Sequence, residues 1–432
     1  MMLSDQAQAP HLSITQQSPL YPVEEVILRQ VARIENWFRE RWHDTPPPLT
    51  SSVDLRNAGF KLAPVDTNLF PAGFNNLNPD AIPLCIQAVQ AALHEYLPSC
   101  QRVLIIPESH TRNLFYNQSL SVLRTIFQKA GFMVRIGNAD IEQTEPVHLP
   151  LPNEEFLIVE PLHREGNRVK LKDFDPCFVL LNNDLSSGVP KILEGLQQRI
   201  KPTAKLGWTS RLKSSHFSFY REVAEEFSEL IGIDPWLLNP MFSTVEELDF
   251  MAKEGVEPLA EAVERLLDSI ADKYKLLDIQ ESPFVMVKAD NGTYGMSVMM
   301  VDSGDTIRQL NRKQRTKMAA SKGSQQVRRV IIQEGVHTFE TMPDGSVAEP
   351  VIYLIGPYVV GGFYRVHQGR GKRDNLNAPG MHFSPLPFDW ACNMPDTDLL
   401  CDESPNRFYT YGVIARLATL AAAREVAAIG GE

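Results

Sequence analysis

Cysteine is scarce in this chain, and the spacing of the few cysteines argues against two classes of protein. The 432 residues include only Cys85, Cys100, Cys177, Cys392 and Cys401. They are odd in number, widely scattered and never arranged as Cys-x-x-Cys, which fits neither the disulfide framework of a small secreted domain nor a zinc site. The sequence therefore predicts a protein of a reducing compartment.

The chain also lacks a membrane-spanning run, a signal segment and an excess of positive charge. No stretch approaches the roughly 20 apolar residues that a spanning helix needs, and the N-terminal segment has neither a basic start nor an apolar core. The formal net charge of -11 gives no general attraction to nucleic acid or anionic membranes, although a local basic cleft can still bind a small anion. We predict a cytoplasmic protein with a flexible leader over residues 1–21 and no nucleic-acid or membrane partner. The sequence leaves the oligomeric state open, a homo-oligomer included.

Hydrophobic residues make up 43% of the chain, enough to bury a large core in two or three domains. Short apolar runs at 102–108, 131–137, 154–160 and 177–184 alternate with a helical pattern at 113–131, which indicates an α/β layer. After residue 205 the pattern changes to helices and then to a strand-rich section over about 283–366. We therefore predict an α/β plus α+β fold, with an N-terminal α/β substrate-side domain over 22–205 and a second domain over 206–432.

Residues 285–300, VMVKADNGTYGMSVMM, combine a strand pattern with a loop rich in small residues. The apolar residues on both sides of Lys288 predict two strands, and NGTYG between them predicts a hairpin. An ordinary turn explains this pattern. A flap also explains it, because small residues let backbone N–H groups cover phosphates while Lys288 reaches the same oxygens.

Two later strands end in polar residues. RRVIIQEGV (328–336) ends in Gln333, Glu334 and Val336, which suits a nucleotide hinge in which backbone groups contact the adenine edge and a carboxylate takes the ribose hydroxyls; a strand running into a turn fits equally. In residues 348–380, two apolar strands lead into basic and then oxygen-bearing side chains. Arginine and lysine can neutralise phosphate, and carboxylate and amide oxygens suit magnesium. The residues concerned are Arg365, Lys372 and Arg373, followed by Asp374, Asn375 and Asn377; a solvated loop is the plainer interpretation of the run.

Residues 52–78 are dense in aspartate, arginine, asparagine and glycine. Such density suits recognition of an amino acid's ammonium and carboxylate groups, although a connector rich in turn-forming side chains has the same composition. Arg112 follows the strand at 102–106, at a position where α/β sheets usually bind ligands. The predicted substrate-binding residues are Asp54, Arg56, Asn57, Asn68, Asn75, Asn76 and Arg112.

The order of these motifs carries a resemblance to a known family. VKADNGTYGMSV and VVGGFYRV…RDNLNAPG resemble the glutathione-synthetase branch of the ATP-grasp superfamily, in which two α+β subdomains clamp ATP. The superfamily layout covers roughly residues 206–432. Over most of its length the chain more closely resembles the proteobacterial glutamate–cysteine ligase family.

The resemblance implies roles for individual residues. Lys288 would hold ATP phosphates, Glu334 would lie at the adenosine hinge, and Lys213 would be the first phosphate lysine, with Lys205 as second choice. Catalysis would come from Lys288, Arg365 and Lys372. ATP would be bound by Lys213, Lys288, Gly292, Thr293, Tyr294, Gly295, Gln333, Glu334, Val336 and Arg373.

The magnesium ligands are less clear, because the chain ends after its last helix, where ATP-grasp enzymes usually add a strand with an acid and a Glu-x-Asn pair. Two alternatives stay open. The ligands come either from Glu349, Asp374, Asn375 and Asn377 or from an N-terminal acid such as Asp54 or Asp66.

The implied activity is ATP-dependent formation of γ-glutamylcysteine from L-glutamate and L-cysteine through a γ-glutamyl phosphate, with ATP and Mg²⁺ required. The absence of a Ser–His–Asp or Cys–His arrangement agrees, since acyl phosphate chemistry needs positioning and charge neutralisation rather than a side-chain nucleophile. Glutathione synthetase or another carboxylate–amine ligase is the first alternative. A regulatory module that binds ATP without turnover is the second.

Overall fold

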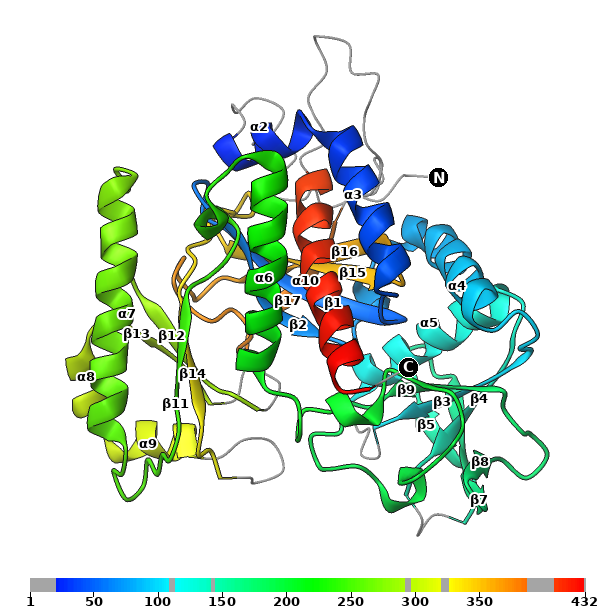
Figure 1. Cartoon of the computed structure of the whole chain (residues 1–432). Helices are drawn as coiled ribbons and strands as arrows, with labels where there is room; N and C mark the ends of the chain where they lie inside the picture. Colours follow the sequence, from blue (N-terminus) through cyan, green and yellow to red (C-terminus); the bar gives the residue numbers. More distant parts are fainter. Residues whose placement is uncertain are drawn as a thin grey trace.

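The computed structural model describes residues 21–108, 113–140, 144–291, 297–319, 326–386 and 408–430. The predicted leader over 1–21 lies outside the described residues, apart from Tyr21. The described chain is a mixed α/β protein with a six-stranded, a five-stranded and a four-stranded sheet and a two-stranded hairpin. Figure 1 shows the four-stranded sheet on the left, the five-stranded sheet in the centre and the six-stranded sheet at the lower right.

The helices and strands of the described chain have the following bounds. The helices are α2 (Pro22–Leu28), α3 (Val31–Asp44), α4 (Ile82–Tyr96), α5 (Leu114–Lys129), α6 (Lys213–Ile231), α7 (Val256–Leu276), α8 (Gly304–Arg308), α9 (Arg312–Ala319) and α10 (Phe408–Ala428). The strands up to the middle of the chain are β1 (Thr50–Asn57), β2 (Leu62–Asn68), β3 (Arg102–Pro107), β4 (Met133–Asn138), β5 (Val147–Pro150), β6 (Phe156–Pro161), β7 (His163–Glu165), β8 (Arg168–Lys170), β9 (Phe178–Asn182) and β10 (Ile200–Lys201). The later strands are β11 (Phe242–Val245), β12 (Val285–Ala289), β13 (Val298–Val301), β14 (Val330–Glu334), β15 (Val347–Ile355), β16 (Tyr358–His367) and β17 (His382–Pro385).

The six-stranded sheet, in the order β10-β9-β3-β4-β6-β5, confirms the α/β layer predicted from the apolar runs. Strands β3, β4, β6 and β9 pair in parallel, and α5 is the crossover between β3 and β4. Helix α5 starts where the Asn113 side chain accepts from the amides of Phe115 and Tyr116, which satisfies two N–H groups that a helix start leaves open. Its apolar face packs on the sheet with α4.

The five-stranded sheet joins the two ends of the chain. Its order is β17-β16-β15-β1-β2, with antiparallel pairing throughout. Strands β1 and β2 come from the N-terminal part, whereas β15, β16 and β17 come from beyond residue 346. Strands from both sides of residue 205 therefore share one sheet, while the division of the chain into domains near residue 205 stays a prediction. Strand pairing between distant segments leaves no mark in local composition, so this sheet could not be predicted.

The four-stranded sheet, β11-β14-β12-β13, packs its apolar face against α7. Strands β12 and β13 pair antiparallel, with Lys288 opposite Val298, so the two strands predicted around NGTYG are confirmed. The residues between them, 292–296, lie outside the described residues.

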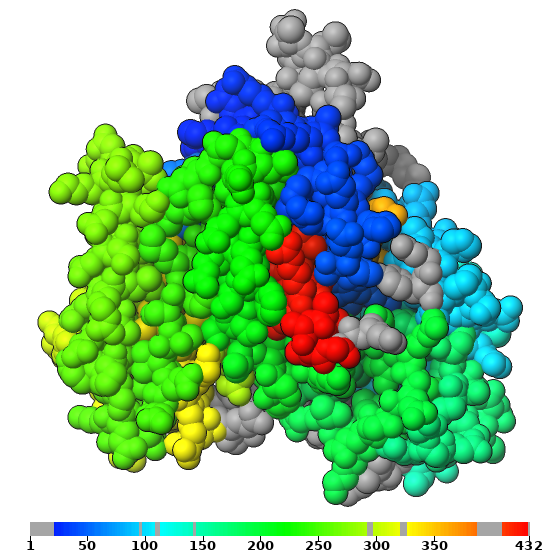
Figure 2. Space-filling view, viewed as in Figure 1, coloured from blue at the N-terminus to red at the C-terminus, as the bar shows by residue number. Residues whose placement is uncertain are grey.

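Helix α10 is buried on all sides between the five-stranded sheet and helices α6, α2 and α3. Every side chain from Phe408 to Ala423 is buried, as expected for a helix that is apolar all round. Figure 2 shows it as a narrow red strip between α6 in green and the N-terminal helices in blue. Its charged residues are paired, since Arg416 binds Glu35 at 2.7 Å and Arg424 binds Glu226 at 2.7 Å.

One cysteine pair corrects the sequence-based view. Cys100 and Cys177 form a disulfide across 77 residues of sequence. They precede β3 and β9, which are neighbouring parallel strands, and only that pairing brings them together. Cys85 is a buried free thiol, while Cys392 and Cys401 lie outside the described residues.

Among the helices that the structure describes, none is both long and apolar enough to cross a membrane.

The buried position of α10 predicts a large cost for truncating its side chains. Leu417 is 0% exposed, so Leu417→Ala should lower the free energy of unfolding by about 2–5 kcal/mol, through lost burial and a residual cavity. Leu276→Ala is the control, because Leu276 ends α7 with 74% of its surface exposed. Thermal or urea unfolding measures both. Equal midpoints for the two variants would contradict the central place of α10 in the core.

Candidate active site

A cleft separates the five-stranded sheet from the four-stranded sheet. Its lining residues come from strands of both sheets, from the start of α6 and from the loop after β16. They are Asp54, Arg56, Val65, Asp66, Lys213, Met286, Lys288, Ala289, Val298, Gln333, Glu334, Val336, Glu349, Arg365, Asn375 and Asn377. Twelve of the residues named from the sequence as candidate site residues thus line one cleft: Asp54, Arg56, Asp66, Lys213, Lys288, Gln333, Glu334, Val336, Glu349, Arg365, Asn375 and Asn377.

The wall formed by the five-stranded sheet carries alternating charges. Successive side chains of a strand point to opposite faces, so Val53 and Leu55 enter the core beneath α10 while Asp54 and Arg56 face the cleft. Asp54 is paired with Asp66 across β1 and β2, and Glu349 with Arg365 across β15 and β16. The part of this face that borders the cleft is therefore ionic.

Arg365 and Arg56 together hold the carboxylates of this wall. Arg365 Nη1 donates to Asp54 Oδ2 at 2.8 Å and to Glu349 Oε1 at 2.5 Å, and Arg56 Nε donates to Glu349 Oε2 at 2.9 Å. Burial would raise the pKa of Glu349, but the two arginines outweigh it and lower that pKa. For Asp54 burial dominates and raises the pKa, with Arg365 opposing it.

The facing wall carries Lys288 on β12 and Gln333 on β14. Lys288 Nζ donates to Gln333 Oε1 at 2.7 Å and across the cleft to the Val65 carbonyl oxygen at 2.8 Å. Burial lowers the pKa of Lys288 to about 8, while Asp66 opposes the shift. The lysine is thus a cation at neutral pH whose proton is easily lost.

Lys213 begins α6 and reaches the same place from a third element. Its Nζ lies 3.0 Å from Asp66 Oδ1 and 3.8 Å from the centre of the Trp208 ring. The start of α6 is fixed by buried Asp290, which accepts from the Ser214 amide and hydroxyl at 2.8 and 2.7 Å. Lys205, the second choice for this role, instead donates to the Ile429 carbonyl at 3.3 Å and does not line the cleft.

Asp66 is the carboxylate on which both lysines converge. Desolvation would raise its pKa, but Lys213, Lys288 and then Arg211 outweigh that effect and hold the pKa at about 2. Asp66 is therefore ionised at neutral pH, and it balances cations that would otherwise repel one another.

Sequence reasoning missed a buried network behind this acid. Arg211 donates to Glu425 on α10 at 2.9 Å and to the Thr67 carbonyl at 2.7 Å. His216 Nε2 lies 2.9 Å from the Thr67 hydroxyl, and its Nδ1 lies 3.4 Å from Glu425. The network joins α10, α6 and β2 beside Asp66. Its members lie up to 358 positions apart, between Thr67 and Glu425, so no sequence motif contains them.

The residues of the predicted hinge border the cleft, and one of them is already bonded within the protein. Gln333, Glu334 and Val336 line the cleft. However, Glu334 Oε2 already accepts from Lys61 at 2.8 Å, from the Trp236 indole at 3.2 Å and from the Met241 amide at 2.9 Å. Its Oε1 has no hydrogen-bond partner among the described residues, so one buried acceptor remains for a ligand hydroxyl.

The basic loop after β16 bridges the two walls. Arg56 donates to the carbonyl oxygens of Val336 at 3.2 Å, of Lys372 at 3.4 Å and of Asp374. Arg373 lies 3.5 Å from Asp302 and 5.0 Å from the Phe284 ring centre, both at the four-stranded sheet. The loop residues Asn375 and Asn377 line the cleft, whereas Lys372, Arg373 and Asp374 do not.

Other predicted residues lie elsewhere. Asn57 donates to the Tyr411 hydroxyl at 3.2 Å, and the Asn68 side chain accepts from the Phe70 amide at 2.9 Å. Asn75 donates to Asn76 and Gln118 at 3.3 and 3.4 Å. None of these four predicted asparagines lines the described cleft. The predicted residues Gly292, Thr293, Tyr294, Gly295 and Arg112 lie outside the described residues.

The oxygen donors of the cleft suit magnesium. Asp54, Glu349, Asn375 and Asn377 line it together, and magnesium is commonly bound by one or two carboxylates plus substrate phosphates. Both oxygens of Glu349 accept from arginines, which leaves Asp54 the freer carboxylate. The Asp374 carboxylate accepts from the Gly371 amide at 2.8 Å. In the described part of the chain, no three histidine, cysteine or acidic side chains form a metal cluster by themselves.

Lys213 and Lys288 come from two separate elements and meet at Asp66 between two sheets. This arrangement is that of a mixed α/β protein whose cleft can bind a small polyanion together with an ammonium group. A family model described as glutamate-cysteine ligase (GshA) matches residues 24–426. The chain therefore belongs to the glutamate–cysteine ligase family, which consists of ATP-dependent ligases. The family resemblance stated from the sequence motifs is confirmed.

One solved structure is similar to this chain over nearly its whole length. The crystal structure of a protein named "Putative gamma-glutamylcysteine synthetase" from Methylobacillus flagellatus KT is 52% identical, with 99% of each chain covered and a TM-score of 0.86. Two distant matches are D-alanyl-alanine synthetase A from Vibrio cholerae O1 biovar eltor, at 10% identity, and a glutathione synthetase-like effector (GSS30) from Globodera pallida, at 9%. Their TM-scores are 0.35 and 0.37; the matches cover 77% and 84% of this chain and 81% of each of theirs. The comparison with curated proteins found no match.

Removing Arg365 should destabilise the fold in a pH-dependent way. Arg365→Met leaves Asp54 and Glu349 without a shared partner, and breaking such a buried pair typically costs about 3–5 kcal/mol. The stranded carboxyl groups would then have raised pKa values in the folded state, so the loss should be largest near pH 8 and shrink as the pH falls toward 5.

Urea unfolding at both pH values measures this effect. Arg308→Met is the control, since Arg308 pairs with three acids at the surface. A loss independent of pH would contradict the ionic role of Arg365.

Proposed function

We propose that this chain joins L-glutamate to L-cysteine with ATP, giving γ-glutamylcysteine, ADP and phosphate through a γ-glutamyl phosphate. The observation that carries the proposal is that Lys213 and Lys288 converge beside Asp66, with Lys213 Nζ 3.0 Å from the Asp66 carboxylate. The chain also belongs to the glutamate–cysteine ligase family. Two lysines that face one cleft from separate elements suit the charge of a triphosphate.

The phosphates of ATP would lie between the two sheets. Lys288 and Lys213 would neutralise the phosphate oxygens, replacing their present contacts with Val65, Gln333 and Asp66. Gly292, Thr293, Tyr294 and Gly295 stay the predicted flap, and Arg373 a predicted phosphate contact. The adenosine would lie against Gln333, Glu334 and Val336, where Glu334 Oε1 is the free acceptor for a ribose hydroxyl.

Acyl transfer follows from charge neutralisation. An oxygen of the glutamate γ-carboxylate attacks the terminal phosphorus of ATP, the bond to the bridging oxygen breaks, and ADP leaves. Arg365 and Lys372 are the predicted groups for stabilising the charge that develops on the phosphoryl group. The amine of cysteine, after losing a proton, then attacks the acyl carbon, and phosphate leaves.

The proton that the cysteine amine releases can be taken up by the departing phosphate. Magnesium would be held by Asp54, Asn375 and Asn377, with Glu349 and Asp374 as the remaining predicted ligands. When bound, it neutralises phosphate charge and aligns the phosphates.

The amino-acid side of the site keeps its sequence-based assignment as a proposal. Asp54 suits an ammonium group, and Arg56 is placed to orient Glu349 and the basic loop. Asn57, Asn68, Asn75, Asn76 and Arg112 stay predicted substrate residues. A two-subdomain clamp of the ATP-grasp kind, a cytoplasmic location and a homo-oligomer also stay predictions.

The reaction itself is tested by coupled ADP release with single amino acids and pairs. We expect sustained release only with glutamate and cysteine together, and γ-glutamylcysteine as the product by mass spectrometry. Release that depends on γ-glutamylcysteine and glycine instead would identify a tripeptide-forming ligase. No release with any pair would leave an ATP-binding module.

Lys288→Met should lower kcat by about a hundredfold and weaken ATP binding, because one phosphate-neutralising charge in a closed site is worth about 3 kcal/mol. Lys275→Met is the matched control, since Lys275 is exposed on α7. Calorimetry with an ATP analogue and steady-state rates are the measurements. Unchanged affinity and rate in Lys288→Met would remove this lysine from the site.

The low pKa of Lys288, about 8, predicts a pH limit. Below that value Lys288 is charged, and as the pH rises through it the cation is lost, so kcat/KM for ATP should fall about tenfold per pH unit above 8. Lys288→Arg, which keeps its charge, should be slower but flat over pH 7–9. Lys61 also has a pKa of about 8. If kcat/KM for ATP still falls above pH 8 in Lys288→Arg, the fall is assigned to Lys61.

A further inference from the structure

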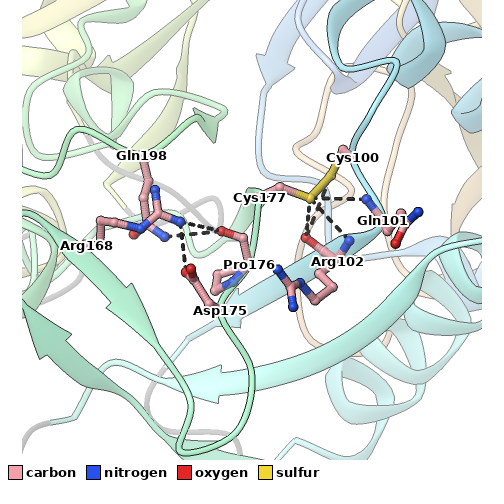
Figure 3. Close-up of a disulfide and its surroundings, with 8 residues drawn as sticks. All are labelled: Cys100, Gln101, Arg102, Arg168, Asp175, Pro176, Cys177 and Gln198. Atoms are coloured by element: carbon pink, nitrogen blue, oxygen red, sulfur yellow. Dashed lines mark hydrogen bonds and ion pairs between the residues drawn. A yellow bond between two sulfur atoms is a disulfide. The ribbon is translucent and has the colours of Figure 1, made fainter.

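The Cys100–Cys177 disulfide lies at the amino-terminal edge of the six-stranded sheet, away from the cleft between the other two sheets. The two Cα atoms are 5.7 Å apart, and both residues are partly exposed. Figure 3 shows the two cysteines meeting beside the backbone of Gln101 and Arg102. The disulfide joins the segments that lead into β3 and β9, which are already paired by hydrogen bonds. The pairing of these two strands can therefore persist when the disulfide opens.

The two sulfur atoms have different surroundings. Cys177 Sγ accepts from the backbone amides of Gln101 and Arg102, each at 3.2 Å (Figure 3). Hydrogen bonds to a thiolate favour the charged form, so Cys177 is the better leaving group of the pair. As a protonated thiol, the same sulfur has the Arg102 carbonyl oxygen 3.2 Å away as an acceptor.

Cys100, in contrast, lines a groove. The groove runs between the second half of α4 and the residues before β3 and β4, with a volume of about 570 Å³, within the range of small-molecule sites. Its wall is apolar at Leu97 and Phe132, with polar groups at Gln90 and His94. Cys177 is not among the lining residues. A small molecule in the groove therefore approaches Cys100 and not its partner.

From this asymmetry we infer that Cys100 is a thiol–disulfide exchange site, which accepts a low-molecular-weight thiol in the groove and releases Cys177. The proposal goes beyond the ligase reaction. The thiol would be either the cysteine that the ligase consumes or the γ-glutamylcysteine that it forms, and this identification rests on the proposed function.

The exchange is balanced without an added oxidant. A thiolate R–S⁻ attacks Cys100 Sγ, the Cys100–Cys177 bond breaks, and the Cys177 thiolate leaves while a Cys100–S–S–R bond forms. A second R–S⁻ can attack the sulfur of the bound R group, giving R–S–S–R and the Cys100 thiolate; the protein disulfide is then reduced by two electrons and two thiols are oxidised. Each step is reversible, and its rate depends on which sulfur is attacked and on how well the other leaves.

The test uses the full chain without ATP or glutamate, so it does not depend on ligase activity. The protein is incubated with γ-glutamylcysteine or with cysteine, quenched with iodoacetamide and mapped by peptide mass spectrometry. We expect the thiol adduct on Cys100 and the carbamidomethyl group on Cys177, in about tenfold excess over the reverse pattern. Cys85, buried and with a pKa raised by burial to about 12, should stay unmodified. The thiol that forms the Cys100 adduct faster, γ-glutamylcysteine or cysteine, is the one that the groove accepts.

Matched variants test the groove. Gln90→Trp fills it and should slow adduct formation about tenfold, while Gln128→Trp, at an exposed position of α5 outside the groove, should not. Several results would overturn the proposal: both cysteines alkylated before any thiol is added, adducts equally on both cysteines or mainly on Cys177, or equal rates in the two variants. If the protein shows no ligase activity in the ADP-release assay but exchanges thiols as expected, only the proposed function is overturned.

Discussion

The antiparallel pairing of β1 with β15 is the constraint on which the site depends. It places residues 50–57 beside residues 347–355, with Asp54 opposite Val351. Because β2 and β16 extend the same sheet on either side, four strands from the two ends of the chain present their polar face together. The apolar face of that sheet receives α10 and α6. The core on one face and the ionic wall on the other thus both arise because successive side chains of a strand point to opposite faces of the sheet.

Charge balance is the second constraint. Every cation named on the cleft walls already has a protein acceptor: Lys213 has Asp66, Lys288 has a carbonyl and an amide oxygen, and Arg365 has Asp54 and Glu349. Unpaired buried charges are costly, and these contacts pair the cations of the cleft within the protein. An anionic ligand must replace these acceptors with better ones, and a triphosphate can do so because it brings several charged oxygens. The contacts with Asp66 and the Val65 carbonyl therefore favour a ligand of high charge.

Much of the fold could be predicted from local patterns. The strands at 102–107, 133–138 and 285–289 follow apolar runs, and α7 and α10 follow helical periodicity. The strands that carry Lys288 and Gln333 could be predicted as well, because polar residues at the end of a buried strand are conspicuous; both residues line the cleft, and their roles toward a ligand stay predictions. The pairing of β1 with β15 across the predicted boundary near residue 205 could not be predicted, since it leaves no local trace. The Cys100–Cys177 disulfide was missed because the cysteines are separated by 77 residues and meet only through the β3–β9 pairing.

The sequence by itself determined the elements, the family and the strand that carries Lys288, because period-two alternation and the twelve-residue motif VKADNGTYGMSV are local properties. Only the tertiary structure decided which groups meet. Asp66 lies beside Lys213 and Lys288, Glu334 is tied to Lys61, and Glu425 reaches Arg211. These partners come from separate strands and helices, and their contacts are electrostatic and made through space. Side-chain charges can pair at any sequence separation, so the packing of the sheets and helices, rather than the order of residues, selects them.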